Sequence, residues 1–77
     1  MLYTRSSFIN YLITVHDCKI ININDRKDKV ITIKNGPAQA FIWASGKDQI
    51  DYEMIIRVCN KLWLTSIPGD KDLEKIE

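Results

Sequence analysis

The stretch Ser45-Gly46-Lys47-Asp48 is the first place in this 77-residue chain where residue types and spacing could do chemistry. A glycine–lysine pair ahead of a helix can cradle phosphate, but a P-loop also needs a glycine five positions before the pair and a Ser or Thr after it. Phe41 and Asp48 occupy these two positions. A carboxylate at a helix start also competes with phosphate for the free backbone N–H groups. We therefore expect a capped helix that starts near Asp48, and not a phosphate site.

His16, Cys18 and Cys59 are the other residues that could act as a base, a nucleophile or metal ligands. A hydrolytic triad needs a carboxylate placed to orient the histidine, and Asp17, as its sequence neighbour, is poorly spaced for that role. Structural zinc normally takes four ligands, and the chain offers these three without any C-x-x-C pair. We expect a partly exposed histidine at a helix end and two reduced thiols packed in the interior, with no catalytic residue, metal or cofactor.

Length and composition indicate one small domain. Apolar residues make up 45% of the chain, which is too many for a disordered segment. The net charge is +1, but residues 1–47 carry seven basic and three acidic groups, whereas residues 48–77 carry four and seven. No stretch is apolar for long enough to span a bilayer, and the N-terminus lacks the features of a signal peptide. We expect a cytoplasmic protein that does not contact a membrane.

The periodicity of apolar residues predicts a helix, three strands and a second helix, in that order. Ser6-Ser7 can cap a first helix over residues 8–16. The expected strands cover residues 18–23, 29–34 and 38–45, with a polar turn at 24–28. Asn35-Gly36 predicts a type I′ hairpin turn, because both central positions of that turn need positive φ.

The second helix, which we expect to end at Trp63-Leu64, carries an apolar stripe and an ordered set of charges. The stripe consists of Ile50, Met54, Ile55, Val58 and Leu62, with Cys59 beside it. Acidic residues lie early in the helix and basic residues late, as the helix dipole favours. Glu53, Arg57 and Lys61 also have the i,i+4 spacing of helical ion pairs, so structure alone accounts for these charges.

These elements predict an α+β fold of the order αβββα, with a three-stranded antiparallel meander and both helices on one face of the sheet. Residues 1–67 form the single domain. Residues 68–77 form a charged C-terminal tail that we expect to be frayed. The sheet face opposite the helices is left open by this arrangement.

Alternation along residues 38–45 makes the third strand the main candidate for a working surface. Its alanines lie on one side, where small side chains let a helix approach closely. Phe41 and Trp43 lie on the other side and should be exposed, unless the strand is flipped and they form the core. The residues expected to join them, as the strand register allows, are Ile20, Val30, Thr32 and Lys34. An open sheet face with two large aromatic residues is typical of a partner interface or of a stacking platform for bases.

The turn Arg26-Lys27-Asp28-Lys29 is the densest basic group in the chain. Arg26, Lys27 and Lys29 are therefore candidates to contact the phosphates of a nucleic acid. Asp25 and Asp28 dilute the positive charge, and charged hairpin turns are common, so a solvated turn without a ligand is the alternative.

The segment SGKDQIDYEMIIRVCNKLWLT, residues 45–65, combines a Gly-Lys-acid-x-Ile lead with a final helix that ends in a Leu-rich turn. Together with the order of elements, this segment resembles the small HicA-type toxins, which have a double-stranded-RNA-binding-like fold. The resemblance implies a small cytosolic protein that binds RNA and an antitoxin partner. That family cleaves RNA with a histidine after a glycine near the start of the second strand. Residues 26–30 contain neither, so the resemblance does not imply nuclease activity.

We expect this chain to be a non-catalytic binding domain and not an enzyme. The favoured function is a protein-interaction module that uses the open sheet face to hold a protein partner or a second copy in a homodimer. The alternative is an RNA-binding module that uses the same face together with the basic turn. The near-zero net charge favours the protein partner.

Overall fold

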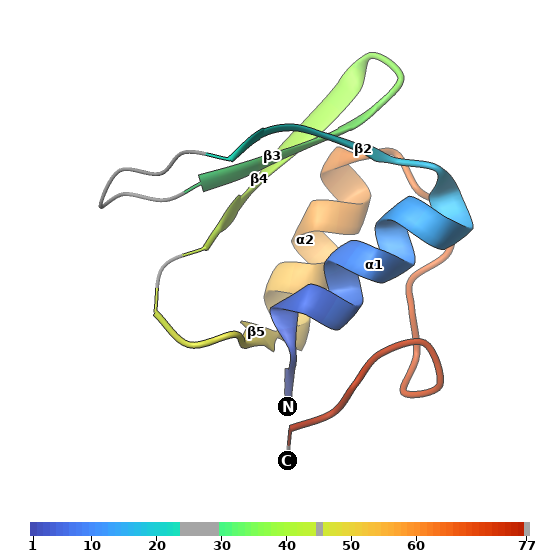
Figure 1. Cartoon of the computed structure of the whole chain (residues 1–77). Helices are drawn as coiled ribbons and strands as arrows, with labels where there is room; N and C mark the ends of the chain where they lie inside the picture. Colours follow the sequence, from blue (N-terminus) through green and yellow to red (C-terminus); the bar gives the residue numbers. More distant parts are fainter. Residues whose placement is uncertain (24–29, 45, 77) are drawn as a thin grey trace.

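The computed structural model describes residues 1–23, 30–44 and 46–76 as a sheet lying over two helices (Figure 1). The main elements are helix α1 (Arg5–His16), strands β2 (Lys19–Ile23), β3 (Val30–Asn35) and β4 (Ala38–Trp43), and helix α2 (Tyr52–Lys61). The strands lie in the order β2-β3-β4, each antiparallel to its neighbour, and both helices cover one face. The predicted αβββα arrangement is confirmed. None of the described helices has the length and apolar character needed to cross a membrane.

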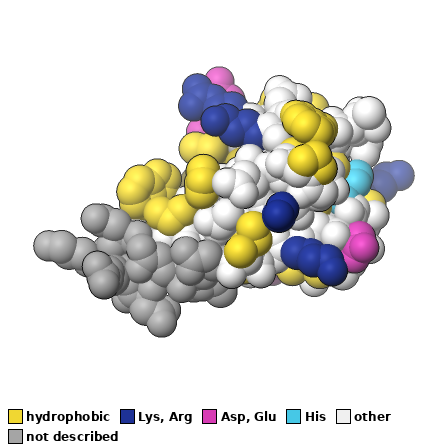
Figure 2. Space-filling model, turned by 90° about the horizontal axis from the view of Figure 1, so that it is seen from above, with side chains coloured by type: hydrophobic (Ala, Val, Ile, Leu, Met, Phe, Trp, Pro, Cys, Tyr) yellow, Lys and Arg dark blue, Asp and Glu magenta, His cyan; other side chains and the backbone are white. Residues whose placement is uncertain are grey.

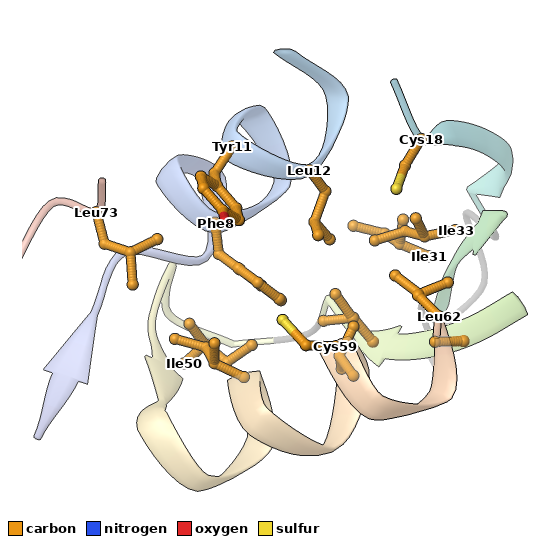
Figure 3. Packing of buried hydrophobic residues seen from close by; sticks show 14 of the residues in the cluster. Phe8, Tyr11, Leu12, Cys18, Ile31, Ile33, Ile50, Cys59, Leu62 and Leu73 are labelled. Atoms are coloured by element: carbon orange, nitrogen blue, oxygen red, sulfur yellow. The ribbon is translucent and has the colours of Figure 1, made fainter. Parts of the chain in front are cut away.

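Side chains from both helices and from the inner face of the sheet meet in one core (Figure 3). The most completely buried members include Phe8, Leu12, Ile33, Ala40, Ile42, Ile55, Val58, Cys59 and Leu62. Alternation along β4 buries Ala38, Ala40 and Ile42. The small alanines allow α2 to pack close to β4, as the sequence predicts.

A second, two-stranded sheet closes the other end of the molecule. Strand β1 (Leu2–Tyr3) pairs antiparallel with β5 (Ile50–Asp51). Strands this short carry no periodic signal in the sequence, so this sheet was not predicted. The second helix also starts later than predicted. The residues after Asp48 are extended, and α2 begins only at Tyr52. The N-cap of α2 is Asp51, whose carboxylate accepts the N–H of Glu53 at 3.1 Å.

The first helix begins at Arg5 and not at Phe8, because Thr4 is the N-cap in place of Ser6-Ser7. The Thr4 hydroxyl accepts the N–H of Ser7 at 3.3 Å. Ser6 donates its N–H and its hydroxyl to the carboxylate of Asp48, at 2.9 and 2.7 Å. The Ser6 side-chain hydrogen bond is the main cause that lowers the pKa of Asp48. Asp48 therefore stabilises the start of α1, and the predicted role as a cap of α2 is wrong.

The hairpin between β3 and β4 turns on Gly36-Pro37, and not on Asn35-Gly36 as predicted. Asn35 pairs with Ala38, which leaves two residues in the turn. Gly36 has a φ of 61°, whereas Asn35 is not among the described residues with positive φ. A positive φ at the first central position alone fits a type II′ turn. The Asn35 side chain instead donates to the carbonyl of Leu62 at 2.7 Å and ties the turn to the end of α2.

The C-terminal tail is packed against the rest of the molecule, so the expectation of a frayed segment is wrong for residues 68–76. The N–H of Thr4 donates to the carbonyl of Glu74 at 2.8 Å, and Leu73 is buried in the core. The Tyr3 hydroxyl donates to the carboxylate of Asp70, and this bond, with burial, raises the pKa of Tyr3 to about 12. Because the tail is rich in charged residues, the sequence did not indicate that Leu73 is buried or that the backbone of Glu74 bonds to the chain next to β1.

Candidate interaction surface

The outer sheet face is defined here as the side of β2, β3 and β4 that turns away from the helices. Figure 2 views the molecule from this side and shows several hydrophobic side chains exposed on it. Phe41 and Trp43 are 58% and 60% exposed on this face, whereas Ala40 and Ile42 beside them are buried. The predicted orientation of the third strand is therefore confirmed. Complete burial of a large apolar side chain gains about 1.5–3 kcal/mol relative to full exposure, and covering these two partly exposed side chains would gain part of that.

Strand register places the predicted surface residues side by side. The directly opposed pairs of β3 and β4 are Val30–Trp43, Thr32–Phe41 and Lys34–Gln39. Opposed residues of an antiparallel pair share a face, so all five predicted members lie on the outer sheet face. Ile20 does not join them: it is opposite Ile33, which is fully buried, so Ile20 belongs to the helix side.

A basic pair lies at the turn end of the same face. Lys19 of β2 is directly opposite Lys34 of β3, an arrangement of like charges that is destabilising unless something compensates it. Asp17 and Gly36 line a shallow hollow of about 270 Å³ together with the two lysines. Asp17 thus offers one negative charge against two positive ones. The sequence did not indicate Lys19, because its contact with Lys34 depends on strand register.

A groove runs between β4 and α2, and we call it the β4–α2 groove. Its volume is about 220 Å³, and it is lined by Phe41 and Trp43 from the strand and by Met54, Arg57, Val58 and Lys61 from the helix. The sequence did not indicate this groove, because the helix dipole and i,i+4 ion pairing already explain Arg57 and Lys61. The available signal was their spacing, which places them beside the apolar residues Met54 and Val58 on one side of the helix.

The residues that first suggested chemistry are accounted for by packing. The His16 Nε2 atom lies 3.0 Å from the Tyr11 hydroxyl oxygen, and the two rings meet edge to face at 5.1 Å between centroids. Cys18 and Cys59 are free and buried, and burial raises the pKa of both thiols, that of Cys59 to about 11. Thiols with raised pKa values are poor nucleophiles at neutral pH. Within residues 1–23, 30–44 and 46–76, no group of His, Cys, Asp and Glu side chains could hold a metal ion.

The basic turn with Arg26, Lys27 and Lys29 lies outside the described residues, so its role in phosphate contact stays a prediction. No family model matches the chain, and no curated protein or solved structure matches it either. The resemblance to the HicA-type toxins likewise stays a prediction, based on residues 45–65 and on the order of the elements.

Proposed function

We propose that this chain is a non-catalytic protein-interaction module whose binding surface is the outer sheet face. The observation that carries the proposal is the pair Phe41 and Trp43, more than half exposed on a sheet whose other side packs against the two helices. Exposed apolar clusters with a polar surround are typical of protein interfaces. Thr32 and Lys34 supply that polar surround here. The packing of the histidine and of both thiols supports a binding role over a catalytic one.

The test compares the two exposed tryptophans of the chain. Trp43 lies on the outer sheet face, and Trp63, at 69% exposure, follows the end of α2 and serves as the matched control. Immobilised parent protein, Trp43→Ser and Trp63→Ser are each used to capture proteins from cells that produce the chain. Sedimentation of the same three proteins across concentrations measures self-association, and thermal melts establish that each variant is folded.

We expect the parent and Trp63→Ser to capture the same protein, or to form the same dimer, and Trp43→Ser to lose it. Equal capture and equal association by all three proteins would refute the outer sheet face as the binding surface. A parent protein that captures nothing and stays monomeric at every concentration would refute the function itself.

RNA binding is a second candidate because Lys19 and Lys34 lie opposite each other on the same face as the aromatic residues. Unstacked bases can pack on aromatic side chains while nearby lysines contact phosphates. Fluorescence anisotropy with a uridine-rich single-stranded RNA at low salt tests this candidate. Salt-sensitive binding that Lys19→Ala with Lys34→Ala weakens would support RNA over a protein partner.

A further inference from the structure

We infer that the free edge of β4 and the β4–α2 groove together take up an extended acidic segment of a partner protein, which adds to the sheet as a further strand. This inference rests on the proposed function, because Phe41 and Trp43 belong both to the outer sheet face and to the groove. It adds the chemistry of the partner and the way in which the partner is held.

The backbone of β4 forms one edge of the sheet, because β4 is its last strand. The hairpin pair Asn35–Ala38 flanks a two-residue turn, so this pair exchanges backbone hydrogen bonds. Bonding and non-bonding pairs then alternate along an antiparallel ladder. The N–H and C=O groups of Gln39, Phe41 and Trp43 are therefore directed away from β3. No described strand pairs with this edge, which leaves it available to an added strand.

The β4–α2 groove beside that edge carries positive charge. Arg57 and Lys61 line the groove, and among the residues that the structure describes, none of those lining it is acidic. Beyond the end of β4, a smaller hollow of about 170 Å³ shares Trp43 and Met54 and includes Asp51. The described lining of the groove is therefore basic towards Lys61, and the neighbouring hollow adds the acidic Asp51 at the β5 end. A partner should place its carboxylates against the basic part.

The two faces of an added strand predict the sequence pattern of the partner. Successive side chains of an added strand point to opposite faces of the sheet. One set would lie beside Phe41 and Trp43 on the outer sheet face and should be apolar. The other set would point towards the groove and should be acidic, because Arg57 and Lys61 lie there. A partner segment in which apolar and acidic residues alternate would match both the outer sheet face and the groove.

Two other occupants fit less well. A second copy joined edge to edge through β4 would bring two sets of Arg57 and Lys61 to one interface, and like charges there oppose association. A single-stranded RNA could stack on the aromatic residues, but its backbone lacks the alternating donors and acceptors that a free strand edge matches. An extended acidic segment can pair with the free edge, place its carboxylates beside the basic residues of the groove and cover the aromatic side chains.

The experiment titrates ¹⁵N-labelled protein with a synthetic peptide of three Val-Glu repeats, acetylated and amidated at its ends. We expect amide shifts in β4 and along α2 at Arg57 and Lys61. A peptide of three Val-Lys repeats and a peptide of the same composition with three valines followed by three glutamates are the controls, and both should bind at least about tenfold more weakly. The same uridine-rich RNA is titrated for comparison.

Backbone pairing is tested with N-methylated peptides. Alternate residues of a strand direct their N–H groups to opposite edges, so methylation of either the valine or the glutamate amides removes the donors of one edge only. Strand addition predicts that one of the two methylated peptides loses binding and that the other keeps it. Equal effects of both would overturn strand addition.

Charge reversal tests the groove. Arg57→Glu with Lys61→Glu should weaken the Val-Glu peptide about tenfold and should make the Val-Lys peptide the better ligand. Lys71→Glu with Lys75→Glu changes the net charge equally in the tail and should leave the preference unchanged. Absence of Val-Glu binding at millimolar concentration, or shifts caused only by RNA, would overturn the inference.

The inference and the proposed function can fail separately. If Trp43→Ser abolishes capture of a cellular partner but Arg57→Glu with Lys61→Glu leaves it intact, the outer sheet face binds a protein without using the groove. If neither set of changes alters capture, the proposed function itself is wrong.

Discussion

The two edge strands of the sheet, β2 and β4, are built differently. An exposed edge can pair with other chains, and proteins commonly block it with charges, bulges or proline. β2 carries Lys19 and has a register irregularity between Ile20 and Asn22. β4 pairs with β3 in continuous register over six residues and contains no charged residue. The contrast indicates that one edge is protected against pairing and that the other is suited to it.

The largest expected effect contrasts the two faces of β4. Ile42→Ala should lower the free energy of unfolding by about 2–5 kcal/mol, because Ile42 is 2% exposed and its truncation leaves a cavity. Trp43→Ala should change it by less than about 1 kcal/mol, because surface substitutions usually have small effects. Urea unfolding of both variants measures the difference. A larger loss for Trp43→Ala would mean that the aromatic face is the packed one.

Proline substitutions test which backbone N–H groups of β4 bond to β3 and which point to the free edge. Ala40→Pro should cost at least about 2 kcal/mol, because it removes an N–H that bonds to β3 and leaves a buried carbonyl without a partner. Gln39→Pro should be tolerated better, because that N–H points to the free edge, yet it should block strand addition. Thermal melts and titration with the Val-Glu peptide test both parts. Equal destabilisation by the two prolines would contradict the assigned ladder.

Asp48 links the segment after β4 to the start of α1, and Asp48→Ala should destabilise the fold by about 1 kcal/mol at neutral pH. Its folded-state pKa is lowered, so its contribution is present above the unfolded pKa and is lost as pH falls through the folded pKa. The melting temperature of the parent should therefore fall more steeply below about pH 4 than that of the variant. Parallel acid profiles would show that the carboxylate adds no stability.

The smallest expected effect concerns the protected edge. Lys19→Glu replaces a directly opposed pair of lysines with an opposite-charge pair to Lys34, which should stabilise the fold by about 0.5 kcal/mol. The gain should shrink at high salt, since the pair is exposed. Thermal melts at low and high salt check this, with Lys71→Glu as a control for net charge. No gain at low salt would mean that Asp17 already compensates Lys19.

Sequence periodicity predicted the parts of the fold that depend on alternation. The strands predicted at residues 29–34 and 38–45 form at 30–35 and 38–43, and they follow from a pattern of period two, as does the outward direction of Phe41 and Trp43. The buried stripe of α2 follows from a pattern of period 3.6. These patterns are local, so the sequence contains them in full.

Contacts between distant segments could not be predicted in the same way. Asp48 looks like a cap of the following helix in the sequence, but its carboxylate accepts hydrogen bonds from Ser6 of α1, which lies far away along the chain. The pairing of β1 with β5 and the burial of Leu73 also depend on where the termini meet. The β4–α2 groove likewise depends on tertiary packing, because its lining residues come from a strand and a helix that are separate in the sequence.

Hydrogen exchange along β4, followed by NMR, tests the free edge most directly. We expect the amide protons of Ala40 and Ile42 to exchange slowly and those of Gln39, Phe41 and Trp43 to exchange rapidly in the free protein. Addition of the Val-Glu peptide should then slow exchange at Phe41 and Trp43. Uniform protection along β4 in the free protein, or no change at these two amides when the peptide is bound, would contradict this expectation.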